Sequence, residues 1–170
     1  MDEKILFHGA IEEIKYPTDD RTTSRSTDFG DGFYLTQLQG QAEKWAITKR
    51  NKAIEKGWKQ AKAIVNVYSL DKEKVIRDFK SKYFSRMTDE WLDFIISNRN
   101  HEEHLYDYVE GPMADDYVYN FVSSLLQGDI TREQFWEKAA FRYPTHQTMI
   151  RHDAIYCLNY IECYEVDSDV

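Results

Sequence analysis

Tyr34 and Trp45 are the two residues whose types and spacing could best do chemistry in this chain. They stand eleven positions apart, Tyr34 in a short apolar stretch and Trp45 in a segment with helical spacing. An aromatic ring at the end of a strand and another in the next helix can face each other across a gap as wide as one ring. A flat cationic ligand suits that gap, because stacking contributes about 0.5–1.5 kcal/mol beyond buried area and a cation adds to it. On spacing alone, burial of both rings in the core explains them equally well.

His8 and Gly9 are the second candidate, at the end of an apolar stretch over residues 5–10. The stretch predicts a short strand, which would deliver the His8 side chain to the edge of a sheet. A single strand histidine is more often structural than functional. Its interest here comes from Gly9 directly after it and from the Tyr34 segment downstream.

Two short patterns do not carry the function that their letters suggest. Asp28, Phe29 and Gly30 spell the metal-binding triplet of protein kinases, but the HRD catalytic loop and the strand lysine motif are absent. Gly30, Asp31 and Gly32 are too few for a dinucleotide fingerprint, and no strand-helix-strand unit surrounds them. We interpret these glycines as part of a turn.

The histidine and acidic clusters also favour structural interpretations. Neither of the two histidine pairs has the HExxH spacing of a metal site, so we expect no metal; the pairs are His101 with His104 and His146 with His152. An acidic stretch favours capping and solvating the start of a helix over catalysis; it consists of Asp107, Glu110, Asp115 and Asp116.

Several short strands interspersed with helices must position these residues. Alternating or β-branched stretches predict strands over residues 5–10, 32–36, 63–70, 106–109, 145–151 and 161–166. Helical spacing and capping residues predict helices over residues 39–55, 88–100, 115–127, 131–140 and 153–160. Residues 15–31 predict a long exposed loop. Because the strands and helices follow no regular alternation, an α+β fold is favoured over a doubly wound one.

The composition suits one globular domain over residues 1–170, since 42% of the side chains are hydrophobic. A formal net charge of −8, without a long basic run, argues against strong non-specific binding to nucleic acid. The first residues lack the basic start and long apolar stretch of a signal peptide, and no apolar run reaches membrane-spanning length. We therefore expect a cytoplasmic protein that does not bind membranes. Cys157 and Cys163 lack metal or redox spacing, and we expect buried or half-buried thiols.

The His8-Gly9 pair, residues 29–36 and Trp45 together resemble the ADP-ribosyltransferase superfamily, in its diphtheria-toxin and poly(ADP-ribose) polymerase branch. Residues 29–36, FGDGFYLT, are similar to the FGxGxYF element of that branch, where a second aromatic residue follows the tyrosine by eleven positions. The resemblance implies an α+β split β-sandwich with flanking helices. It also implies NAD as the co-substrate.

The resemblance assigns roles to individual residues. Tyr34 and Trp45 would clamp nicotinamide, His8 would hydrogen-bond the ribose or adenosine end of NAD, and Gly9 would offer backbone groups to the carboxamide. The catalytic set would be His8, Tyr34 and Gln147. The remaining implied NAD contacts are Phe29, Gly32 and Thr36.

The chain also resembles a bacterial family of ADP-ribosyltransferase-like proteins that are often encoded beside short partners. The shared stretches are residues 8–9, 28–36, 63–70, 90–94, 106–116 and the segment from 147 onward. This resemblance implies a toxin with a small cognate antitoxin-like protein as its partner. The acceptor of ADP-ribose would be a macromolecule, either protein or nucleic acid.

The sequence departs from the superfamily at two positions. Active members carry a glutamate at the start of a late strand, where its carboxylate holds a ribose hydroxyl, but this chain has Gln147. A neutral acceptor gives about half the strength of a charged one and cannot act as a general base. Ala42 stands near the position where polymerase-type members often use a serine.

Arg25 is the best candidate to bind the NAD diphosphate, because a guanidinium can pair with phosphate oxygens in a bidentate manner. A solvated loop arginine explains Arg25 equally well, and Arg21 and Lys15 are weaker alternatives.

Our first hypothesis is therefore NAD-dependent transfer of ADP-ribose to a macromolecule. A catalytically silent module that binds NAD or ADP-ribose and regulates a partner is the alternative, which Gln147 favours. Replacing Gln147 by glutamate should retain or raise NAD cleavage, because a carboxylate interacts more strongly with a positive centre.

Overall fold

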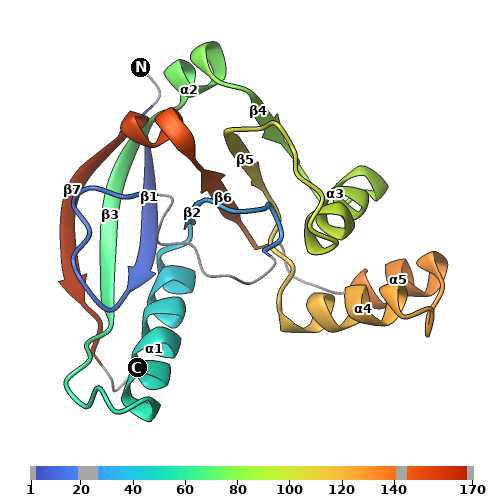
Figure 1. Cartoon of the computed structure of the whole chain (residues 1–170), viewed down its shortest axis with the longest axis horizontal. Helices are drawn as coiled ribbons and strands as arrows, with labels where there is room; N and C mark the ends of the chain where they lie inside the picture. Colours follow the sequence, from blue (N-terminus) through green and yellow to red (C-terminus); the bar gives the residue numbers. More distant parts are fainter. Residues whose placement is uncertain (1–2, 19–26, 141–144, 168–170) are drawn as a thin grey trace.

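A three-stranded antiparallel sheet forms one half of the structure (Figure 1). The computed structural model describes residues 3–18, 27–140 and 145–167. In this sheet β1 (Glu3–Ala10) and β7 (Leu158–Glu165) flank β3 (Ile64–Asp71). The β-branched run that predicted β3 is buried over all but its two end residues, as expected for a central strand.

A second sheet of four short strands adjoins the first. Its order is β2 (Phe33–Leu35), β6 (Gln147–Ile150), β5 (Tyr108–Gly111) and β4 (Ser81–Tyr83). Only the β4–β5 pair in this sheet is parallel among the described strands. The two sheets meet where Phe7 and Thr36 exchange two backbone hydrogen bonds of 2.8 and 2.9 Å. β1 and β2 are thereby held side by side.

The helices begin where the capping residues predicted them. Thr88, Asp115 and Thr131 each accept a hydrogen bond from a backbone N–H in the first turn that follows. They precede α3 (Asp89–Arg99), α4 (Asp116–Leu126) and α5 (Arg132–Ala139), which lie beside the second sheet, away from the first (Figure 1). α1 (Gln39–Glu55) packs on β1.

Two cores occupy the two faces of the second sheet. Phe33 and Ile150 pack toward the first sheet, against Leu6 and other residues of its inner face. Val109 and Met149 pack on the opposite face, in one cluster with residues of α3, α4 and α5, including Trp91, Val118 and Phe135. Because side chains alternate along a strand, Glu110 of β5 points toward the first sheet and Gln147 of β6 points with Met149 toward the helices.

Several predictions of secondary structure were wrong. A single helix was predicted over residues 153–160. The structure has a 3-10 helix (His152–Cys157) followed directly by β7, because β7 pairs with the edge of β3 that β1 leaves open. α2 (Lys72–Asp78) and β4 come from a stretch with no readable pattern. The predicted long exposed loop is wrong at Asp28 and Phe29, which are buried.

The structure is a mixed α+β fold with two sheets and several helices, which confirms the predicted class. None of the helices in the described part of the chain is long and apolar enough to cross a membrane. Cys157 is buried and Cys163 is half-buried, and both are free thiols.

Candidate functional site

His8 is fixed at the junction between β1 and β2. Its Nδ1 donates a hydrogen bond to the carbonyl oxygen of Tyr34 at 2.5 Å. The imidazole also stacks on Phe33, with 4.2 Å between ring centroids and 27° between ring planes. Because a carbonyl oxygen can only accept, this bond places a proton on Nδ1 and sets the orientation of the ring.

Gly9 lets β1 approach the backbone of α1. A Cβ at this position would lie 2.3 Å from the carbonyl oxygen of Ala42 and 3.0 Å from the Cβ of Trp45. Any side chain would therefore push β1 away from α1. The structure brings Gly9 and Trp45 together. The close packing of β1 on α1 is by itself sufficient to require a glycine at this position.

The carbonyl oxygen of Gly9 already has a partner. Lys49 donates to it from Nζ at 2.6 Å. Although much of the Lys49 side chain is exposed, desolvation around the ammonium lowers its pKa to about 8. A ligand carboxamide would have to share this oxygen, which has a second lone pair.

Tyr34 uses its hydroxyl to hold the turn that precedes β2. The Tyr34 hydroxyl donates to the carbonyl oxygen of Gly30 at 2.5 Å and accepts from the N–H of Phe29 at 3.1 Å. Burial raises the pKa of this hydroxyl well above its ordinary value. Tyr34 as a whole residue is half-buried and packs against the core between the second sheet and the helices.

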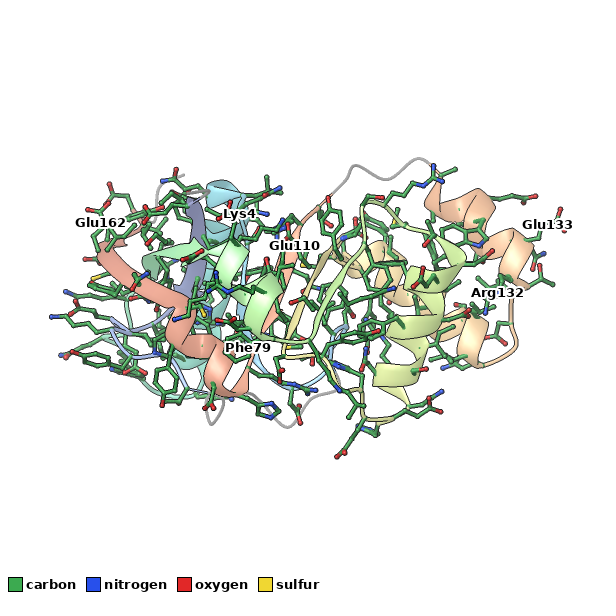
Figure 2. The ribbon with its side chains drawn as sticks, turned by 90° about the horizontal axis from the view of Figure 1, so that it is seen from above. Lys4, Phe79, Glu110, Arg132, Glu133 and Glu162 are labelled. Carbon is green, nitrogen blue, oxygen red and sulfur yellow. The ribbon has the colours of Figure 1, made fainter. Side chains whose placement is uncertain are left out.

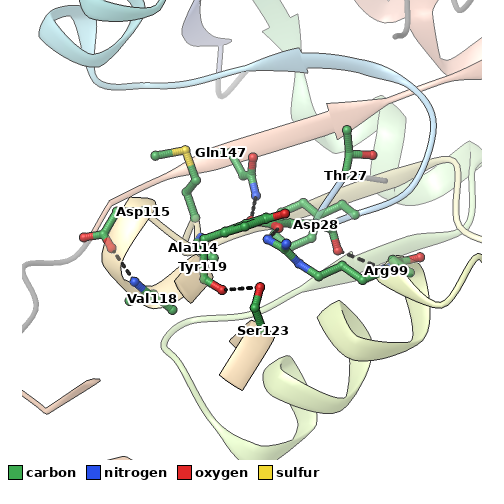
Figure 3. Close-up of polar contacts among 12 residues, drawn as sticks. Thr27, Asp28, Arg99, Ala114, Asp115, Val118, Tyr119, Ser123 and Gln147 are labelled. Carbon is green, nitrogen blue, oxygen red and sulfur yellow. Dashed lines mark hydrogen bonds and ion pairs between the residues drawn. The ribbon is translucent and has the colours of Figure 1, made fainter. Parts of the chain in front are cut away.

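Gln147 joins a buried cluster around Asp28 (Figure 3). Its Nε2 donates to Oδ2 of Asp28 at 3.2 Å, and the N–H of Ala114 donates to the same oxygen at 3.1 Å. Oδ1 of Asp28 forms an ion pair of 2.5 Å with Arg99, whose guanidinium lies 4.0 Å from the ring centroid of Tyr119. Asp28 is thus bound from three separate parts of the chain.

These contacts link the predicted catalytic residues into one series. His8 bonds to the backbone of Tyr34, the hydroxyl of Tyr34 bonds to Phe29, and the neighbouring Asp28 bonds to Gln147. The strands that carry His8, Tyr34 and Gln147 are therefore connected through residues 28–29. Sequence reasoning dismissed Asp28 as a false kinase triplet, because the contacts that define it come from residues 98, 99, 114 and 147.

The other predicted NAD contacts have structural partners. Phe29 is fully buried between Phe84 and Phe94, so only its backbone reaches the site. Gly32 lies so close to Met149 that a Cβ would be 2.4 Å from its sulfur. Thr36 is buried and accepts from the N–H of Leu38, at the turn into α1.

The predicted diphosphate ligand Arg25 lies outside the described residues, as does its alternative Arg21. The second alternative, Lys15, is exposed and lies 3.8 Å from the carboxylate of Glu13. Within residues 3–18, 27–140 and 145–167, no three His, Cys, Asp or Glu side chains come close enough to hold a metal ion.

A second buried carboxylate, Glu110, lies between the two sheets (Figure 2). It forms an ion pair with Lys4, a second with Lys72 at 3.3 Å, and hydrogen bonds with Tyr108 at 2.6 Å and His146 at 3.3 Å. Burial alone would raise the pKa of Glu110, but the hydrogen bonds from His146, Lys4 and Tyr108 outweigh it and lower the pKa far below its usual range.

Glu110 lines a cavity of about 390 Å³, a size typical of small-molecule sites. Lys4, Lys72 and His146 line it with Glu110, but His8, Tyr34, Trp45 and Gln147 are not among the lining residues. The prediction that Glu110 belongs to a solvated helix start was therefore wrong. Strand alternation over residues 108–111 was the signal that could have placed Glu110 on the inner face with Tyr108.

The fold and site together define a mixed α+β protein in which the three strands that carry the predicted histidine, tyrosine and glutamine are linked by hydrogen bonds. The chain belongs to the DUF3990 family of proteins of unknown function, which matches residues 4–160. No curated protein and no solved structure gives a significant match.

Proposed function

We propose that this protein is an ADP-ribosyltransferase that takes NAD as its co-substrate and has the split β-sandwich of that superfamily. The observation that supports the proposal most is the series of hydrogen bonds from His8 through Tyr34 and residues 28–29 to Gln147. Trp45, whose Cβ lies next to Gly9, would supply the second ring of the nicotinamide clamp. A half-buried Tyr34 is compatible with stacking.

Transfer breaks the bond between ribose C1′ and the nicotinamide nitrogen, and the bonding electron pair leaves with nicotinamide. Positive charge then develops on the ribose, where the carbonyl oxygen of Gln147 would accept a hydrogen bond from the 2′-hydroxyl. A nucleophilic atom of the acceptor forms the new bond to C1′ and releases its proton to solvent. Gln147 orients the ribose and takes no proton, because an amide is not a base at neutral pH.

The partners in this proposal are a macromolecular acceptor, protein or nucleic acid, and a small cognate antitoxin-like protein. They rest on the sequence resemblance, and a cytoplasmic location rests on the hydropathy pattern of the sequence. The acidic net charge of −8 supports an acceptor recognised specifically over one attracted by charge alone.

A silent module that binds NAD or ADP-ribose is the second candidate function. Two contacts favour it. Lys49 holds the carbonyl oxygen of Gly9, and the hydroxyl of Tyr34 is used within the protein. The first contact takes up an oxygen that an active site would offer to the nicotinamide carboxamide, and the second uses the Tyr34 hydroxyl to hold the turn before β2.

Incubation with NAD labelled in its adenylate part and a whole-cell extract separates the two functions. Label in protein or nucleic acid, lost in Gln147→Ala, supports the transferase. Calorimetric binding of NAD without any nicotinamide release supports the silent module. Absence of both binding and cleavage would reject both candidates.

A further inference from the structure

We propose that Asp28 is the positioning residue for Gln147, and that the two side chains together replace the single glutamate of active transferases. The inference rests on the proposed function, because it names how Gln147 is prepared for that reaction. Asp28 touches neither NAD nor the acceptor in this scheme. It acts through the Gln147 amide.

The chemistry of the contact fixes which way the amide points. An ionised carboxylate has acceptors only, so the group of Gln147 that faces Oδ2 of Asp28 at 3.2 Å must be the NH2 group. The carbonyl oxygen lies on the other side of the same planar amide. A flipped Gln147 would bring two oxygen acceptors together, which is unfavourable in a buried site.

Asp28 cannot turn to follow a moving amide. Arg99 holds Oδ1, the N–H of Ala114 shares Oδ2, and Asn98 donates to the backbone carbonyl of Asp28 at 2.9 Å. These partners come from α3 and from the segment before α4 (Figure 3). The carboxylate is therefore held in one position, and it orients the amide of Gln147.

The contact also changes the electronics of Gln147. Donation from an amide N–H to a charged acceptor is stronger than to a neutral one, and linked hydrogen bonds polarise one another. The carbonyl oxygen of Gln147 thereby gains negative charge on the side that would face the ribose. As the electron pair of the C1′–N bond leaves with nicotinamide, that oxygen stabilises the positive ribose through the 2′-hydroxyl.

Arg99 and Gln147 contact different oxygens of Asp28, so their roles can be separated. A purely structural Asp28 would serve to neutralise Arg99, and Gln147 would be incidental. The matched control is Arg99→Met, which removes the ion pair at Oδ1 and none of the groups that contact Oδ2.

The experiment compares NAD cleavage by the parent, Asp28→Asn, Gln147→Glu and the double variant, with folding checked by thermal denaturation. We expect Gln147→Glu to lose at least tenfold, because two carboxylates would face each other. Asp28→Asn should also lose about tenfold, because the amide of Gln147 can then flip. The double variant should recover to the parent rate or above, since the amide introduced at position 28 can donate to the carboxylate introduced at position 147. If the double variant instead loses NAD cleavage by the product of the two single-variant losses, the proposal is wrong.

A second readout does not need activity. The side-chain NH2 signals of Gln147, identified by their loss in Gln147→Ala, should exchange slowly with solvent in the parent and in Arg99→Met. Asp28→Asn should shift them and speed their exchange, and unchanged signals would overturn the positioning role. If Asp28→Asn does not fold, Asp28→Glu moves the carboxylate by one methylene and gives the same comparison.

The two readouts also separate this inference from the function on which it rests. A parent protein that never cleaves NAD, but whose Gln147 signals respond to Asp28→Asn, would reject the transferase and keep the Asp28–Gln147 orientation.

Discussion

The ammonium of Lys49 donates a hydrogen bond to the carbonyl oxygen of Gly9 at 2.6 Å, across the contact between α1 and β1. This single bond puts a cation next to the residue that the sequence assigned to the nicotinamide carboxamide. Desolvation around the same ammonium lowers its pKa to about 8. Both properties can be measured.

Replacing Lys49 by methionine should change how stability depends on pH. The folded pKa of Lys49 lies below its unfolded value near 10.5, so the unfolded chain binds more protons between about pH 8 and pH 10.5. In the parent this group destabilises the fold below about pH 8, and the penalty fades as pH rises. The effect is small, because Lys49 is an exposed residue and solvent screens its charge. Urea unfolding gives the free energy of unfolding of both proteins at pH 7 and pH 10. The parent should gain stability relative to the variant between these two pH values, and an unchanged difference in free energy would contradict the pKa shift.

Tyr34→Phe and Trp45→Ala should separate the clamp from the fold. Tyr34→Phe keeps the ring and removes the bonds to Phe29 and Gly30, so stability should fall by about 1–3 kcal/mol with NAD affinity kept. Trp45→Ala should weaken NAD binding by roughly 1–3 kcal/mol. Trp58→Ala is the control, since Trp58 is exposed. Calorimetry with NAD that finds Trp45→Ala equal to Trp58→Ala would exclude the clamp.

Glu110→Gln should destabilise the fold by about 3–5 kcal/mol, because it leaves the partly buried ammonium groups of Lys4 and Lys72 without their counter-charge. The lowered pKa of Glu110 means that its contribution is present above the unfolded pKa, about 4.5, and is lost as pH falls further. The free energy of unfolding of the variant, measured with urea at several pH values, should therefore fall less steeply at acidic pH than that of the parent. Glu165→Gln, which removes an exposed partner of Lys62, is the control and should change little.

Expression without a partner should slow bacterial growth if the protein is an active toxin. Gln147→Ala should relieve the effect, because it removes the group that orients the ribose and should reduce NAD cleavage about 10²-fold. Growth curves with matched amounts of folded protein supply the measurement. Equal growth with parent and variant would count against the toxin.

The structure revises one expectation for Gln147. From the sequence, glutamate at this position should retain or raise NAD cleavage. With the carboxylate of Asp28 only 3.2 Å from Nε2, a second carboxylate would be repelled, and the substitution alone should reduce activity. The relevant neighbour is 119 positions away, so no local pattern could have shown it.

Local signals predicted what depends on neighbouring residues. Thr88, Asp115 and the Thr131–Gln134 capping box mark helix starts through contacts made within three positions. β7 was misplaced because its extent is set by pairing with β3, about ninety residues away in sequence. Glu110 was misjudged for the same reason, since Lys4 lies 106 positions before it.

The strand order has a consequence for folding during synthesis. β1 and β3 emerge early, but the other edge of β3 waits for β7, and β2 waits for β6 to join it to β5. The strand pairing of neither sheet can be completed until residues 147–165 have left the ribosome. Pairings over such separations are slow to form and leave strand edges exposed meanwhile. The nascent chain is therefore exposed to aggregation for most of its synthesis, and chaperones that shield open strand edges should matter more for its yield than for a protein with local pairing.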